Sequence, residues 1–162
     1  MFNLDEVEAL CNSLSQAFKQ SIKRNAIKLP PGAERCSPGE ALVFWLADWL
    51  MKARLLGPDE LRLVIDDLAG DVKTFGDGLA GCNNLGGRIL KLPTAKLVFL
   101  DRRHVCLDGR PLFVDLKTGA VAEAIDYKPL ETIAYNLTGL YLRYSQALKS
   151  PNLEPSEDAN RA

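Results

Sequence analysis

The clearest alternation of apolar and polar positions lies in the last third of the chain. Residues 112–116 and 120–125 have the pattern of two strands joined by the turn Lys117-Thr118-Gly119. The spacing then becomes helical and predicts an amphipathic helix from Pro129 to about Lys149, with one face formed by Leu130, Ile133, Ala134, Leu137, Leu140, Tyr141, Tyr144 and Leu148. This ending predicts a sheet packed with a helix, and it brings no reactive side chain with it.

The first third of the chain has helical spacing. One helix is predicted from a cap at Asn3 to about Asn25, with apolar residues at intervals of three and four. A second helix begins at Ser37-Pro38-Gly39-Glu40, because a hydroxyl cap, a first-turn proline and a glutamate three residues after the cap are typical of a helix start. Leu56-Gly57-Pro58 supplies its stop.

The middle of the chain is rich in glycine, which weakens the pattern. A third helix is predicted from Pro58 to about Leu68, with its end at Gly70. Short strands are predicted at 72–75 and 88–92. Glycines between these segments favour loops, so the region is expected to be irregular.

Two further strands precede the C-terminal hairpin. The apolar run 95–100 predicts a buried strand, and 104–107 continues the sheet before the hairpin turn Asp108-Gly109. Three helices, about four antiparallel strands and a closing helix indicate one α+β domain over residues 1–150. The polar, proline-containing residues 151–162 are predicted to be a disordered tail.

The predicted second helix is apolar around almost its whole circumference. Only Asp48, Lys52 and Arg54 interrupt its apolar residues. Such a helix is either the buried centre of a domain or half core and half interface. Under the second interpretation, the candidate partner-binding residues on this helix are Phe44, Trp45, Trp49 and Met51.

Composition narrows the classes of protein. The chain has 162 residues, 47% of them hydrophobic and 25% charged, with a net charge of −1, which argues against a general nucleic-acid binder. The acidic start lacks the pattern of a secretory signal, and the longest apolar run, 41–47, is far shorter than the roughly 20 residues of a membrane span. A cytoplasmic protein without a membrane span is expected.

Cysteine and histidine do not form a metal pattern. Cys11, Cys36, Cys82 and Cys106 are widely spaced, and His104 is the single histidine of the chain. Structural zinc sites use paired ligands at short spacing. We therefore predict no metal, no cofactor and thiols that are reduced or buried.

Two motifs offer candidate chemistry. Residues 76–81 spell the glycine pattern of a dinucleotide-binding loop, with Asp101 near the position of a ribose-binding acid, but the sequence after it is poor helix material, so a flexible loop is expected. His104, Cys106 and Asp108 share one face of a predicted strand, and a Cys–His pair can activate a thiolate. Ordinary alternation, with Val105 and Leu107 inward, is the preferred explanation.

Charge is uneven along the chain. Asp66 and Asp67, with Asp59, Glu60, Asp71 and Asp77 around them, predict a solvated acidic face that is a candidate docking surface. A basic cluster is expected near residues 19–28, formed by Lys19, Lys23, Arg24 and Lys28. Nucleic-acid binding by this cluster is disfavoured because interleaved aromatic residues are missing.

Residues 114–121, followed by Ile133-Ala134-Tyr135-Asn136-Leu137 and Leu140, resemble the C-terminal end of SUKH-superfamily proteins. That superfamily includes bacterial toxin-immunity proteins and the SecY-interacting protein Syd. Residues 88–93 are also similar to a stretch of Syd. The resemblance covers under half of the chain, transfers no functional residue, and implies a small protein that acts by contact with another protein.

These observations lead to one main hypothesis and two alternatives. The main hypothesis is a protein-binding module, such as a bacterial immunity protein or adaptor, whose partner is another protein, a toxin for example, or a second copy in a homodimer. The first alternative is a small-molecule-binding domain or enzyme that uses the loop 76–87, with Cys82 or Cys106 as nucleophile. The second is nucleic-acid regulation through the basic cluster.

Overall fold

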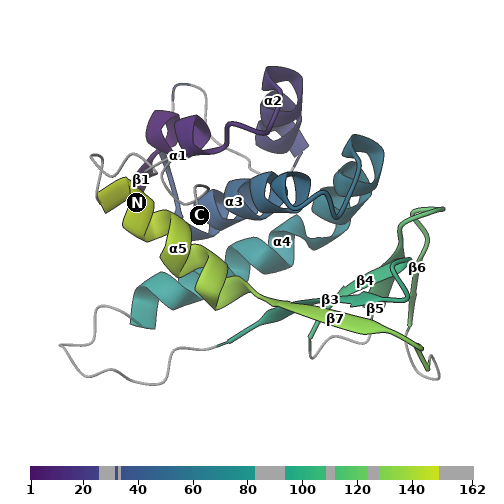
Figure 1. Ribbon diagram of the computed structural model, residues 1–162. Helices are drawn as coiled ribbons and strands as arrows, with labels where there is room; N and C mark the ends of the chain where they lie inside the picture. Colours follow the sequence, from purple (N-terminus) through teal and green to yellow (C-terminus); the bar gives the residue numbers. More distant parts are fainter. Residues whose placement is uncertain (26–31, 33, 83–93, 109–111, 124–127, 150–162) are drawn as a thin grey trace, which may run out of the picture.

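The computed structural model describes residues 1–25, 32, 34–82, 94–108, 112–123 and 128–149 (Figure 1). The predicted strand at 88–92 and the predicted tail 151–162 lie outside these residues. In chain order the elements are β1 Phe2–Asn3, α1 Leu4–Leu10, α2 Gln16–Asn25, β2 Arg35–Cys36, α3 Pro38–Lys52, α4 Pro58–Cys82, β3 Lys96–Leu100, β4 His104–Leu107, β5 Leu112–Asp115, β6 Val121–Glu123, β7 Thr132–Asn136 and α5 Leu137–Lys149.

Helices cover one face of an antiparallel sheet, which confirms the α+β class (Figure 1). The sheet has five strands in the order β6-β5-β4-β3-β7, and β1 and β2 form a separate two-stranded pair. In the register, Leu97 lies opposite both Leu107 and Tyr135. Tyr135 contacts Trp49 of α3, so this face of the sheet faces the helices. Its buried side chains are Leu97, Phe99, Val105, Leu107 and Val114.

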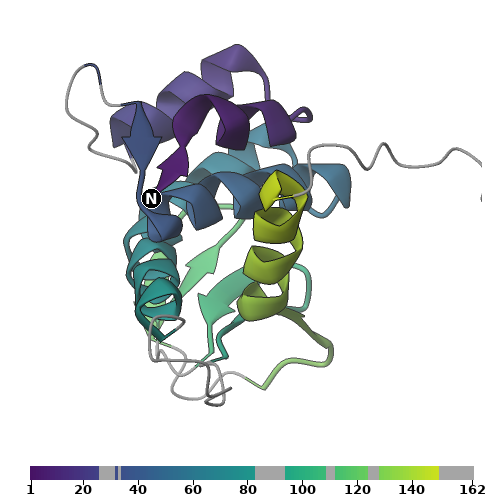
Figure 2. The same ribbon diagram turned by 90° about the vertical axis from the view of Figure 1, so that its left-hand side faces the viewer.

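Helix α3 is the centre of the helical layer. It packs most extensively on α4 and also contacts α1 and α5 (Figure 2). Ser37 and Glu40 form the predicted capping box, with the Glu40 N–H donating to Ser37 Oγ over 3.1 Å and the Ser37 N–H donating to Glu40 Oε2 over 2.7 Å. Phe44 and Trp45 are fully buried. The predicted second helix is therefore confirmed, with its first half in the core.

The predicted first helix is wrong as a single element. The chain forms α1 and α2 with a break between them, because Ser13 turns toward α3 and binds Asp48. Ser15 then begins α2 by accepting the N–H of Phe18 over 3.2 Å. Serine side chains compete with the helical backbone, and here two of them end one helix and start the next.

The predicted third helix is too short, and the strand predicted at 72–75 is wrong. Helix α4 runs from Pro58 through Gly70 to Cys82. Glycine costs a helix roughly 1 kcal/mol relative to alanine. Packing of α4 on α3 and on the sheet overrides that cost, because it buries Val64, Leu68, Val72 and Leu79.

The last helix begins later than predicted. Residues 132–136 form β7, and α5 begins at Leu137. Exposure alternates along β7, with Ile133 and Tyr135 half-buried and their neighbours exposed, which is the two-residue period of a strand. Asn136 caps α5 by accepting the N–H groups of Thr138 and Gly139. The hairpin of β5 and β6 is confirmed, with Gly119 at a φ of +71° in its turn.

Candidate functional site

The partner-binding residues predicted on α3 separate into two groups. Phe44 and Trp45 are fully buried, with the Trp45 ring 5.6 Å from Tyr144 and 5.3 Å from Phe2, so neither side chain reaches the surface. Trp49 and Met51, near the end of α3, are only partly buried. Each of these two side chains lines a separate hollow.

The first hollow, here called the Trp49 hollow, lies where α3, β7 and α5 meet. Its volume is about 190 Å³, and it is lined by Leu46, Trp49, Tyr135, Asn136, Leu137, Gly139, Leu140 and Arg143. The Trp49 and Tyr135 rings meet edge to face, with centroids 4.6 Å apart. Arg143 is exposed and has no ion-pair partner among the described residues. The hollow is thus apolar with one cation at its rim.

The second hollow, here called the Met51 hollow, lies between the α1–α2 connection, α2, the end of α3 and the start of α4. Its volume is about 370 Å³, and it is lined by Ser13, Leu14, Ser15, Ala17, Phe18, Ser21, Met51, Pro58, Asp59 and Arg62. Phe18 and Met51 supply large, partly buried apolar side chains. Serines and the two charged residues of α4 supply polar groups around them. An apolar centre with a polar rim is the usual composition of a protein interface.

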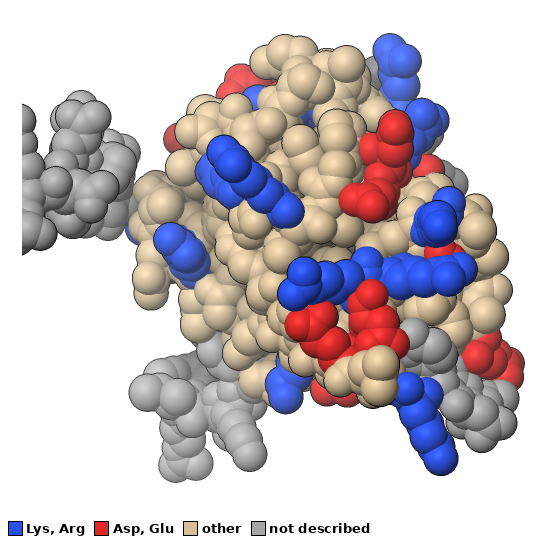
Figure 3. Space-filling view, turned by 45° about the vertical axis from the view of Figure 1, so that its right-hand side comes forward, with Lys and Arg blue, Asp and Glu red and all other residues tan. Residues whose placement is uncertain are grey.

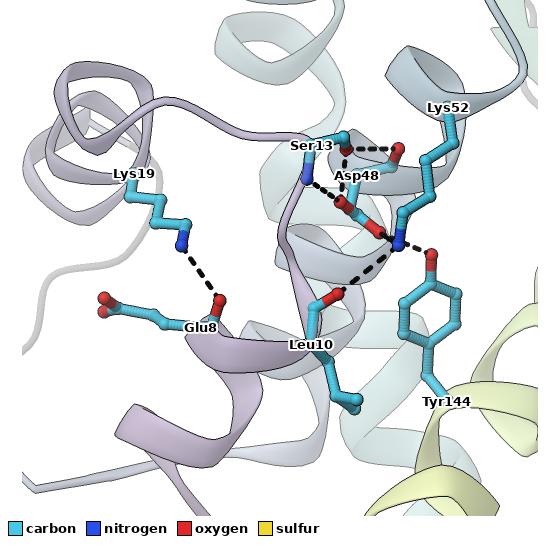
Figure 4. Close-up of polar contacts among 7 residues, drawn as sticks. All are labelled: Glu8, Leu10, Ser13, Lys19, Asp48, Lys52 and Tyr144. Carbon is cyan, nitrogen blue, oxygen red and sulfur yellow. Dashed lines mark hydrogen bonds and ion pairs between the residues drawn. The ribbon is translucent and has the colours of Figure 1, made fainter. Parts of the chain in front are cut away.

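A buried carboxylate of α3 binds residues of the α1–α2 connection and of α5 (Figure 4). Asp48 of α3 has no exposed surface, and its Oδ1 accepts the N–H of Ser13 over 3.1 Å as well as the Ser13 hydroxyl. Its Oδ2 accepts the Tyr144 hydroxyl over 2.7 Å and lies beside the Lys52 ammonium over 2.5 Å. Ser13 lines the Met51 hollow, so Asp48 holds one wall of that hollow in place.

The electrostatics of this network favour a structural role. Burial, followed by the hydrogen bond to Asp48, raises the pKa of Tyr144 far above its ordinary value, so the phenol remains a donor. Burial, followed by the negative charge of Asp48, raises the pKa of Cys11 to about 12. Lys52 also donates to the carbonyl of Leu10 over 3.4 Å (Figure 4). The Cys11 thiol and the Tyr144 phenol therefore stay neutral, and the Asp48 carboxylate is paired. None of these three groups is an activated nucleophile.

The acidic candidates lie on α4, near the Met51 hollow. Asp66 is exposed and lies 3.9 Å from Arg62, which lines that hollow. Partial burial, followed by the neighbouring charge of Asp66, raises the pKa of Asp67. On the face shown in Figure 3, acidic and basic side chains lie next to one another and leave uncharged surface between them. The structure therefore places Asp66 beside Arg62, which lines the same hollow as Met51, while Phe44 and Trp45 stay in the core.

The prediction of a flexible glycine-rich loop is wrong for residues 76–82, because these residues belong to α4. A Cβ on Gly76 would lie 2.7 Å from the Gly39 Cα, so this glycine permits the close crossing of α3 and α4. Asp77 accepts the N–H of Gly39 over 2.8 Å at the start of α3. Asp101 accepts the N–H groups of Leu130 and Glu131. Residues 83–87 lie outside the described part of the chain.

The strand residues His104 and Cys106 do not form an activated pair. Burial raises the pKa of Cys106, with a further contribution from Asp108, which disfavours the thiolate. His104 Nε2 instead lies 3.7 Å from Asp115, a carboxylate that also binds Arg103 over 2.7 Å. Cys11, Cys36 and Cys106 are buried free thiols, as predicted. The side chain of Cys82 is outside the described atoms.

The basic cluster is partly used inside the molecule. Lys19 is buried and donates to the Glu8 carbonyl over 2.9 Å, and Lys23 forms an ion pair with the Glu8 carboxylate (Figure 4 shows Lys19 and Glu8). Arg24 is exposed, and Lys28 lies outside the described residues. Two of the four predicted cations are therefore committed to holding α2 on α1.

Sequence reasoning missed part of each hollow. The positions of Phe18 and Arg143 depend on how α2 and α5 dock, for which the sequence carries no signal. Asp48 did leave a signal, since a carboxylate inside an apolar helix requires buried partners. No family model, curated protein or solved structure matches the chain.

The described ranges contain neither a metal-ligand set nor a membrane-spanning helix. Among residues 1–25, 32, 34–82, 94–108, 112–123 and 128–149, no three histidine, cysteine or acidic side chains come together as a metal-ligand set. Within the same residues, no helix combines the length and the apolar character that crossing a membrane requires.

Proposed function

We propose that this protein works by binding another protein, and that the partner docks on the Met51 hollow. The observation that carries the proposal is the composition of this hollow. Phe18 and Met51 are large apolar side chains that the fold leaves partly accessible, and Ser13, Asp59 and Arg62 surround them. Methionine is common at such surfaces because its flexible thioether adapts to different partners.

The acidic face of α4 extends the proposed surface. Asp59 lines the hollow, and Asp66 lies one turn beyond Arg62 on the same helix. Carboxylates beside an apolar centre steer a partner whose complementary surface is basic. The proposed docking surface therefore consists of the Met51 hollow together with Asp66 and Asp67.

The more specific role we propose is that of an immunity protein or adaptor in the bacterial cytoplasm. Its support is the resemblance of residues 114–121, 133–137 and Leu140 to SUKH proteins. An immunity protein needs a binding surface and no chemistry of its own, which agrees with the structural use of Asp48, Asp77 and Cys106 described above. A toxin encoded beside this chain is the partner that this role requires.

The experiment is a binding measurement between the purified chain and the product of the neighbouring reading frame. Replacing Met51 by lysine places a charge at the centre of the hollow and is expected to weaken binding by about thirtyfold or more, since central anchors contribute roughly 2 kcal/mol. Val121→Lys is the matched control, because Val121 is an apolar side chain 49% exposed on β6, outside the hollow.

The outcomes distinguish the two levels of the proposal. Binding by the unchanged chain and by Val121→Lys, lost only in Met51→Lys, supports both. Equal binding by all three proteins contradicts the Met51 hollow as the docking surface. A neighbouring product that does not bind at all contradicts the immunity role.

A further inference from the structure

The sheet ends in two edge strands, of which only one carries a protecting feature. Strand β6 has three residues, and one of them is Glu123. Strand β7 has five residues, Thr132-Ile133-Ala134-Tyr135-Asn136, without a charge or a proline. Short length, charge and proline are the usual means by which proteins prevent edge strands from pairing with other chains. The β7 edge is therefore open to pairing.

The hydrogen bonds show which backbone groups face outward from β7. Leu137 N–H donates to Ala95 O over 2.9 Å, and Asp101 N–H donates to Glu131 O over 3.0 Å, so residues 131 and 137 point toward β3. Inward and outward groups alternate in an antiparallel strand. The N–H and C=O groups of Thr132, Ala134 and Asn136 consequently point away from β3. In the described part of the sheet, β7 has no neighbour on that side.

We propose that β7 pairs antiparallel with β7 of a second copy of this chain, around a two-fold axis at Ala134. In this register Ala134 lies opposite Ala134 of the copy, and Thr132 lies opposite Asn136. The Ala134 pair can exchange two backbone hydrogen bonds, and in each outer pair the Asn136 N–H can donate to the Thr132 C=O, while the Asn136 C=O accepts the first bond of α5. Their side chains are small or polar and uncharged, which avoids repulsion across the axis.

The same register fills the Trp49 hollow with residues of the copy. Residues opposite one another in an antiparallel pair have side chains on the same face. Ile133 of the copy then lies opposite Tyr135, and Glu131 of the copy lies opposite Leu137, and both of these neighbours line the hollow. The apolar part of the hollow receives the isoleucine.

Charge complementarity also favours a second copy of the chain as the occupant of the Trp49 hollow. Arg143 is the charged residue among those lining it and has no ion-pair partner in the described structure. Glu131 of the copy supplies a carboxylate on the same side. Its ion pair with Arg102, 2.9 Å long, joins two exposed side chains and is weakly held. Ile133 of the copy thus complements the apolar part of the hollow, and Glu131 of the copy complements Arg143.

A proline at position 134 tests the pairing directly. Because the Ala134 N–H points away from β3, Ala134→Pro removes an outward donor and leaves the bonds between β3 and β7 intact. The matched control is Val121→Pro on the opposite edge. There, Asp115 N–H donates to Ala120 O over 2.9 Å, so by alternation the Val121 N–H also points outward.

Sedimentation equilibrium of the full chain, from micromolar to millimolar concentration, gives the readout. The unchanged chain and Val121→Pro are expected to dimerise with the same dissociation constant, and Ala134→Pro to require at least tenfold higher concentration. A monomer throughout the range, or equal dimerisation by Ala134→Pro, overturns the proposal. Circular dichroism verifies the fold of each variant.

A charge exchange tests the hollow even if the proline variant fails to fold. Arg143→Glu alone and Glu131→Arg alone should each weaken dimerisation, because each places like charges together. The double variant should restore it. Single variants that dimerise normally, or a double variant that is not restored, contradict the proposed register. The Met51 hollow is not part of this pairing, so either proposal can fail without the other.

Discussion

At the scale of single residues, Asp48 links α3 to the α1–α2 connection and to α5. It is buried, and it joins the backbone of Ser13, the hydroxyl of Tyr144 and the ammonium of Lys52. A buried carboxylate is stable only when such partners satisfy it. Its loss therefore removes polar contacts of α3 with α5 and with Ser13, which lines the Met51 hollow.

We predict that Asp48→Ala lowers the free energy of unfolding by about 2–5 kcal/mol, since it leaves the Ser13 N–H and the buried Tyr144 hydroxyl without their acceptor, at roughly 1–3 kcal/mol each. Asp66→Ala is the control, because this exposed carboxylate has only a weak contact with Arg62, and a change within about 0.5 kcal/mol is expected. Urea unfolding measures both. Equal effects of the two substitutions would show that Asp48 is not a central support.

Asp115 makes the protein sensitive to acid. The hydrogen bond from Arg103, followed by that from the Lys117 N–H, holds the pKa of this carboxyl well below its ordinary value. A carboxyl with a depressed pKa in the folded state stabilises the protein above its unfolded pKa of about 3.9, and this contribution is lost as the pH falls below that value.

We predict that Asp115→Asn reduces the fall in Tm between pH 5 and pH 2, roughly the range in which an unfolded aspartate gains its proton. The unchanged chain should lose more stability over the same range, because only it gains a proton at this site on unfolding. Thermal unfolding followed by circular dichroism measures both curves. Parallel curves would contradict the role assigned to Arg103.

At the scale of elements, local sequence signals predicted starts and strands better than helix lengths. The cap at Ser37, the apolar run 95–100 and the alternation in 104–107 were sufficient to predict a helix start and two strands, because these signals lie within a few residues. The length of α4 was not predicted, since packing on α3 overrides its glycines. The break at Ser13 and the strand β7 were not predicted either, because each depends on a contact with a distant part of the sequence. Ser13 binds Asp48, and β7 pairs with β3.

The two glycines of α4 provide a matched test of this explanation. We predict that Gly76→Ala destabilises the protein by about 1–3 kcal/mol, since its Cβ would lie 2.7 Å from the Gly39 Cα and force α3 and α4 apart. Gly78→Ala meets no atom within 4 Å and should stabilise the helix by roughly 0.5–1 kcal/mol. Chemical unfolding measures the free energy of unfolding of both variants. Stabilisation by Gly76→Ala would contradict the close crossing.

At the scale of the whole molecule, α3 organises both candidate surfaces. Its buried half, with Phe44 and Trp45, fixes the core, and its last turns place Trp49 and Met51 in separate hollows. The sequence left two alternatives for α3, a fully buried helix or one shared between core and surface. It did not indicate which residues do which, because that division depends on the docking of α2, α4 and α5.

The central claim is that a partner protein docks on the Met51 hollow, and a hydrogen-exchange footprint of the complex tests it most directly. Amide exchange of the chain is compared with and without the neighbouring gene product, under conditions in which the chain alone has the same oligomeric state. Protection is expected in residues 13–21, around Met51 and in 58–62, the segments that line the hollow. Protection confined to other segments, with these unchanged, would contradict the account.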